Sequence, residues 1–115
     1  DLLKGVQTVN GVQFVGAQVD VNSADALKKL AFELKGVLNN FVIVLVAAVD
    51  GKAQVVLLFD EVVVASKNLD AGATIKQKIA PLIKGGGGGQ KTLATAGGQN
   101  TADLEQVIEA VKNLL

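Results

Sequence analysis

Two glycine-rich segments and the lysines beside them are the residues of this sequence best suited to chemistry. Gly85–Gly89 is a run of five glycines between Lys84 and Lys91, and a second segment, Gly97-Gly98-Gln99-Asn100, follows it. A backbone without side chains allows another chain or a phosphate to approach closely. Lysine ammonium groups and backbone N–H groups both bind anions. The chemistry that this pattern favours is therefore the binding of a phosphate or a polyanion.

Of the two segments, the second is the better anion site. The run follows the C-terminus of a predicted helix, whose partial negative charge repels phosphate, whereas Gly97-Gly98-Gln99-Asn100 leads into the N-terminus of a predicted last helix. The run is not a P-loop, because that motif joins a strand to a helix and ends in Gly-Lys-Ser/Thr, and Gln90 comes next here. Because each glycine costs about 0.5–1 kcal/mol in a regular element relative to alanine, we expect Gly85–Gly89 to be a loop. That loop is either a flexible connector or a bare backbone surface.

The charges of the chain balance overall but not locally. The chain has eleven basic residues, all of them lysine, and eleven acidic residues, so its formal net charge is +0. No acidic residue occurs between Asp70 and Asp103, and this window contains Lys76, Lys78, Lys84 and Lys91. A basic face within a neutral protein predicts attraction for a polyanion, and an ordinary solvated surface is the alternative.

Six residue types are absent from the 115 residues: Arg, His, Cys, Met, Trp and Tyr. Without Cys and His there is no disulfide, thiolate nucleophile, imidazole base or histidine-containing metal site. Without Arg, the bidentate guanidinium contacts with phosphate are excluded. We therefore expect binding rather than catalysis, with no metal and no cofactor. The four aromatic residues, Phe14, Phe32, Phe41 and Phe59, stand in apolar patterns and are predicted to lie in the core rather than to stack on bases.

The elements that position the glycines alternate between strands and helices. We predict strands at 12–21, 41–49, 52–59 and 93–96, with turns at Asn10-Gly11 and Asp50-Gly51. Asn22-Ser23 caps an amphipathic helix that ends at 36–40. At 60–68 the three valines 62–64 favour a strand and Asp60-Glu61 resembles a helix start, and we expect a short helix or turn. A helix capped by Asp70 carries Pro81 near its end, which should bend the helix or remove one hydrogen bond. Asn100 or Thr101 caps a last helix.

This order predicts a single layered α/β domain, in which a mixed sheet of about four to five strands packs with three main helices. We assign residues 10–115 to the domain and residues 1–9 to the remnant of an upstream connecting helix or linker, with Asp1–Lys4 as the tail of that helix. The longest apolar run, Phe41–Val49, is too short to span a membrane, so no membrane partner is expected.

The two glycine motifs and their context resemble the C-terminal domain of alanyl-tRNA synthetase, which has the DHH-associated domain fold. The residues that carry the resemblance are Gly85–Gly89 with Gln90, and then Ala94-Thr95-Ala96-Gly97-Gly98-Gln99-Asn100. Ser66–Gly72, before the third helical segment, and the order of the upstream strands also agree, so that the resemblance covers about residues 10–115. The related phosphoesterases usually continue the glycine run into a His, and Gln90 therefore favours the synthetase.

The resemblance implies a non-catalytic domain that binds the outer corner of tRNA and links aminoacylation with editing in a parent alanine–tRNA ligase. Its implied partners are alanine-specific tRNA, the other domains of the same synthetase and, through an upstream helix, a second copy in a homodimer; the implied location is the cytoplasm. The candidate tRNA-binding residues are Lys76, Lys78, Lys84, Gly85, Gly86, Gly87, Gly88, Gly89, Gln90, Lys91, Gly97, Gly98, Gln99 and Asn100. Two alternatives remain open: the nucleic-acid-binding half of a DHH-family phosphoesterase, and a dimerisation or structural module.

Overall fold

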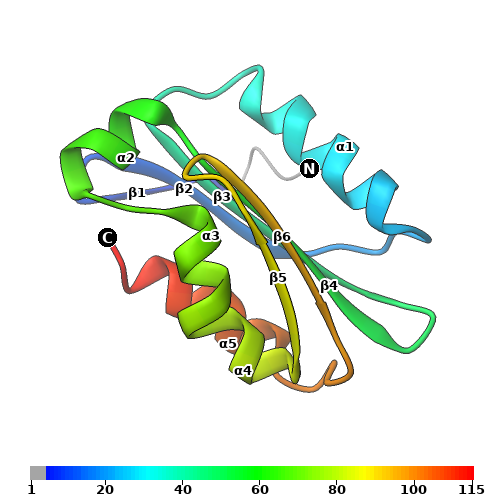
Figure 1. The fold of residues 1–115 in the computed structure, drawn as a ribbon. Helices are drawn as coiled ribbons and strands as arrows, with labels where there is room; N and C mark the ends of the chain where they lie inside the picture. The colour runs from blue at the N-terminus through cyan, green and yellow to red at the C-terminus, as the bar shows by residue number, and fades with distance from the viewer. Residues whose placement is uncertain (1–4) are drawn as a thin grey trace.

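A mixed β-sheet with helices on both faces organises the chain (Figure 1), and the computed structural model describes residues 5–115. The strands are β1 (Gln7–Val9), β2 (Val12–Gln18), β3 (Phe41–Val49), β4 (Lys52–Phe59), β5 (Gly85–Gly89) and β6 (Leu93–Gly98). The helices are α1 (Ala24–Lys35), α2 (Glu61–Lys67), α3 (Ala71–Thr74), the π-helix η2 (Ile75–Ile79), α4 (Ala80–Ile83) and α5 (Leu104–Lys112). The predicted α/β class with a mixed sheet is confirmed, and the described residues form six strands rather than four or five.

The sheet has the order β1-β2-β3-β4-β6-β5, so β5 is an edge strand. Among the described strands only β2 and β3 pair in parallel, and α1 supplies the crossover that a parallel pair requires. The turns predicted at Asn10-Gly11 and Asp50-Gly51 are confirmed, since all four residues have positive φ and close two-residue hairpins. The first hairpin brings Gln7–Val9 into the sheet as β1, whereas the sequence predicts a connecting helix or linker at 1–9. The helix tail predicted for Asp1–Lys4 lies outside the described residues.

Each face of the sheet has its own apolar core. The face under α1 contains Val15, Ile43, Leu45, Val56 and Leu58, against which Leu27, Ala31 and Leu34 pack. The opposite face contains Phe14, Val44, Val55, Leu57 and Ala96, which α2, η2, α4 and α5 cover through Val63, Ile75, Ile79, Ile83, Leu104 and Val107. α1 contacts β3 and β4, so it leaves the β6–β5 end of its face uncovered (Figure 1).

The helix predicted after Asn22-Ser23 is confirmed, but the prediction that every phenylalanine lies in the core is wrong for Phe32. The Ser23 hydroxyl accepts a hydrogen bond from the Ala26 amide at 3.0 Å and caps α1. Phe32 is 39% exposed, whereas the other three phenylalanines are buried. The Phe32 ring lies beside Lys28 and Lys35, whose Nζ atoms are 5.8 and 5.9 Å from its centroid. The ring therefore contacts ammonium groups rather than the sheet.

The segment between β4 and β5 is helical, as expected. The Asp70 carboxylate accepts a hydrogen bond from the Ala73 amide at 3.1 Å and caps α3. Ahead of Pro81 the helix widens into η2, in which the Ala80 amide donates to the Ile75 carbonyl. Proline lacks the N–H that an α-helix would use at this point, and a local π-turn is one way for a helix to adjust its hydrogen bonds. Within residues 5–115, no helix combines the length and the apolar character needed to cross a membrane.

Candidate nucleic-acid interface

The glycine run forms the edge strand β5, so the prediction of a loop at Gly85–Gly89 is wrong. It pairs antiparallel with β6, from Gly85 opposite Gly98 to Gly89 opposite Ala94. Both ends of the strand are fixed by backbone hydrogen bonds: the Gln90 amide donates to the Leu93 carbonyl at 2.8 Å, and the Gln99 amide donates to the Lys84 carbonyl at 3.4 Å. These bonds and the pairing with β6 override the weak strand tendency of glycine.

Glycine is sterically required at alternate positions of β5. A Cβ atom at Gly85, Gly87 or Gly89 would lie only 2.0, 2.2 or 2.3 Å from a backbone carbonyl oxygen of β6. At Gly86 a Cβ would meet no atom of the described chain within 4 Å, and at Gly88 the nearest atom would be Lys76 Cε at 3.4 Å. The absence of a Cβ atom at positions 85, 87 and 89 therefore lets β5 approach β6 closely, whereas Gly86 and Gly88 have room for one.

The helices behind the ribbon formed by β5 and β6 hold both of its ends. At one end, the amides of Ala71 and Gly72 donate to the carbonyls of Lys91 and Gln90, each at 3.0 Å. A Cβ at Gly72 would lie 2.8 Å from the Gly89 carbonyl oxygen, so α3 and β5 meet backbone to backbone. The ribbon is therefore anchored on α3 rather than hanging free of the domain.

At the other end, the second glycine segment differs from its predicted form. Gly97 and Gly98 are the last two residues of β6 rather than a loop before the last helix. The Asn100 amide group donates at 2.8 Å to both the Leu82 carbonyl and the Asp103 carboxylate, so this side chain joins the end of α4 to the start of α5. The N-cap of α5 is Asp103, not Asn100 or Thr101.

The predicted lysines gather around the glycine strand. Lys84 is the C-cap of α4 at one end of β5, and Lys91 follows β5 at the other end. Lys76 comes from η2, and its Cε approaches Gly88. Lys78 is on the same π-helix. All four lysines are exposed, and so are Gln90 and Gln99. The structure thus places positive charge at both ends and beside the middle of a strand that has no side chains.

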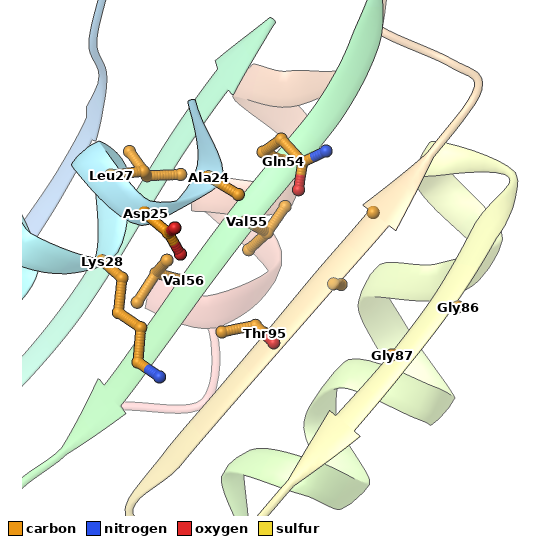
Figure 2. Close-up of a pocket in the computed structure, with 12 residues that line it drawn as sticks. Ala24, Asp25, Leu27, Lys28, Gln54, Val55, Val56, Gly86, Gly87 and Thr95 are labelled. Carbon is orange, nitrogen blue, oxygen red and sulfur yellow. The ribbon is translucent and has the colours of Figure 1, made fainter. Parts of the chain in front are cut away.

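A polar hollow of about 330 Å³ lies on the other side of the ribbon, between α1 and the β6–β5 end of the sheet (Figure 2). Asp25 and Lys28 of α1, Gln54 of β4 and Thr95 of β6 line it, and β5 adds the bare backbone of Gly86 and Gly87. A second hollow of about 260 Å³ shares Lys28 and Thr95 with the first and continues to Gln90.

Sequence reasoning missed the four polar side chains of this hollow. The one signal was Gln54, a polar residue inside the otherwise apolar strand β4. In the part of the chain that the structure describes, no group of three or more Asp, Glu, His or Cys residues could hold a metal ion. The geometry favours binding by lysines, amides and exposed backbone.

Comparison with known proteins identifies the family. Residues 11–115 match the family model described as the DHHA1 domain. The chain belongs to the DHHA1 family. The domain is 37% identical to the alanine–tRNA ligase of Streptococcus pneumoniae (strain CGSP14) over 115 residues, which is all of this chain. It is 36% identical to the alanine–tRNA ligase of Cytophaga hutchinsonii over 110 residues, which is 96% of this chain. In both cases the DHHA1 domain spans 12% of the length of the relative.

The fold of the DHHA1 domain is also that of a solved structure. The crystal structure of the C-Ala domain from Aquifex aeolicus alanyl-tRNA synthetase superimposes with a TM-score of 0.82, covering 96% of each chain at 21% identity. The predicted resemblance to the synthetase C-terminal domain is thus confirmed at the level of family and fold.

Proposed function

We propose that this DHHA1 domain is the tRNA-binding C-terminal domain of an alanine–tRNA ligase and that the domain itself is not catalytic. Its similarity to alanine–tRNA ligases over the whole chain and its C-Ala fold support this assignment. The observation that carries the proposal is the placement of Lys76, Lys84 and Lys91 around the bare edge strand β5. A sugar–phosphate backbone can approach such a strand closely, because no side chain stands between it and the lysines.

The residue types at this surface suit recognition of shape and backbone rather than of sequence. Lysines and backbone amides contact phosphates and riboses, and such contacts position a nucleic acid without reading its bases. Folded RNA is recognised largely in this way. We therefore assign the domain to the outer corner of tRNA, where it helps to hold one alanine-specific tRNA for the aminoacylation and editing domains of the parent enzyme. Gln90 follows the glycine run and the chain contains no His, which favours this assignment over a phosphoesterase.

Filter binding of alanine-specific tRNA across a series of salt concentrations tests the proposal. The variants are Lys76→Gln, Lys84→Gln and Lys91→Gln, each of which removes one charge. The matched control is Lys112→Gln, in the last turn of α5. This end of the chain lies away from β5, at the β1–β2 edge of the sheet, where the Asn10 side chain donates a hydrogen bond to the Leu115 carbonyl.

Affinity should fall as salt rises, and each of the three variants should reduce the slope of log K against log[salt] by roughly 0.7–0.9, one phosphate contact. Lys112→Gln should leave the slope unchanged. An acceptor-stem hairpin without the tRNA corner should bind more weakly than the whole tRNA. The absence of binding by the unmodified chain at low salt, or equal slopes for all four variants, would refute the proposal.

A further inference from the structure

The hollow between α1 and the ribbon has the properties of a small ligand site. Its volume of about 330 Å³ lies at the lower end of the usual range for such sites, about 300–1,000 Å³. Its polar side chains, those of Asp25, Lys28, Gln54 and Thr95, come from three different elements (Figure 2). Among the hydrogen bonds between residues 5–115, none uses any of these four side chains. Their donors and acceptors are therefore available to a ligand.

The glycines of the ribbon keep this hollow open and its floor flat. Gly97 of β6 lies opposite Gln54 of β4 and Gly86 of β5, and both glycines line the hollow. A Cβ at Gly97 would lie 3.4 Å from Gln54 Oε1, so a larger side chain there would cover the amide. A flat ring can consequently lie against peptide planes while its edge faces the Gln54 amide.

We propose that this hollow receives one unstacked nucleobase of the RNA bound along β5, an inference that rests on the function proposed above. The edge of a base carries donors and acceptors in one plane, and unstacked bases are the parts of RNA that proteins read by hydrogen bonding. Gln54 and Thr95 can each donate and accept, and Asp25 accepts from base N–H groups. The polar groups of the hollow thus complement a base edge.

Lys28 supplies the charge that such a nucleotide needs at the mouth of the hollow. It lines both hollows, so it lies between the base site and the part of the ribbon that leads to Gln90. Its Nζ is 5.8 Å from the Phe32 ring centroid, a contact that holds the ammonium beside α1. From this place it neutralises the phosphate of the nucleotide whose base is bound.

Two uncharged variants separate base recognition from phosphate contact. Thr95→Val preserves shape at an exposed strand position, and Gln54→Leu removes the amide. Thr8→Val, exposed on β1 at the opposite edge of the sheet, is the matched control. Each site variant should weaken tRNA binding roughly 2- to 12-fold, the effect of losing one hydrogen bond. The salt slope should not change, because no charge is removed. The control should bind as the unmodified chain does.

Nuclear magnetic resonance of the 115-residue chain provides the direct readout. The side-chain amide of Gln54 and the backbone amides of Gly86 and Gly97 should shift on titration with AMP, GMP, CMP and UMP, but not with ribose 5-phosphate. If tRNA binds while both site variants retain full affinity and these signals do not move, the inference is overturned and the proposed function stands. If the unmodified chain fails to bind tRNA, both are overturned.

Discussion

The alternation of required and free glycines in β5 predicts opposite effects for two neighbouring substitutions, Gly87→Ala and Gly86→Ala. The methyl group of Gly87→Ala would lie 2.2 Å from the Thr95 carbonyl oxygen and 2.6 Å from Ala96 Cα. Both are backbone atoms of β6, which also pairs with β4, so they cannot move without disturbing the centre of the sheet. The methyl group of Gly86→Ala meets no described atom within 4 Å.

The magnitudes follow from the two kinds of environment. Overpacking costs about 1–3 kcal/mol, whereas a glycine-to-alanine change at a compatible position stabilises by roughly 0.4–1 kcal/mol, because it restricts the unfolded chain. With about 2.1 cal/mol/K of unfolding entropy per residue over 115 residues, 1 kcal/mol corresponds to roughly 4 °C in Tm. We expect Gly87→Ala to lower Tm by about 4–12 °C and Gly86→Ala to raise it by about 2–4 °C.

Far-ultraviolet circular dichroism during heating, together with urea unfolding, measures both variants against the unmodified chain. A flexible loop at 85–89 would accept either alanine with the same small change in stability. Equal Tm values for the two variants would therefore refute the strand geometry and support the loop that composition alone suggests.

Two further predictions concern side chains whose roles differ from the sequence-based expectation. Phe32→Ala should lower the free energy of unfolding by less than about 1 kcal/mol, because the ring is 39% exposed. Phe59→Ala should lower it by about 3–5 kcal/mol, because that side chain is only 2% exposed. Urea unfolding measures both variants, and equal losses of stability would contradict the different burial of the two rings. Asn100→Ala should lower the free energy of unfolding by about 1–3 kcal/mol, because it leaves the Leu82 carbonyl without its side-chain donor. The affinity for tRNA, measured below the Tm, should be retained. A loss of affinity without a loss of stability would show that Asn100 contacts the tRNA directly.

The sequence predicted best the elements whose pattern is local. The α1 helix has a cap at Ser23 and a buried stripe at helical spacing, and both hairpin turns have the Asn-Gly or Asp-Gly pair that positive φ requires. The fold class follows from the order of these elements, and the family from the two glycine motifs. Lys84 and Lys91 were found because they flank the run in sequence as well as in space.

The errors occurred where distant parts of the chain decide the structure. A strand is predicted from the alternation of apolar and polar side chains, which a run of glycines lacks. The sequence of Gly85–Gly89 therefore does not indicate that pairing with β6 will make it a strand. The Asn100 side chain joins the Leu82 carbonyl of α4 to the Asp103 carboxylate before α5, and these two groups come together only in the folded chain. The hollow combines α1, β4, β5 and β6, which are far apart in sequence. Phe32 is different: its spacing from Lys28 and Lys35 already put it on the outer side of the helix.

An exposed sheet edge usually carries a risk of self-association, and β5 limits that risk by its composition. Edge strands attract other strands because their backbone groups are unpaired, and proteins often protect them with charged residues or proline. Segments that stack into fibrils have high strand propensity and few glycines. A strand that approached β5 would find hydrogen-bonding groups but no side chains to pack against, with lysines at both ends. The glycine run thereby combines an accessible edge with a low tendency to recruit other strands.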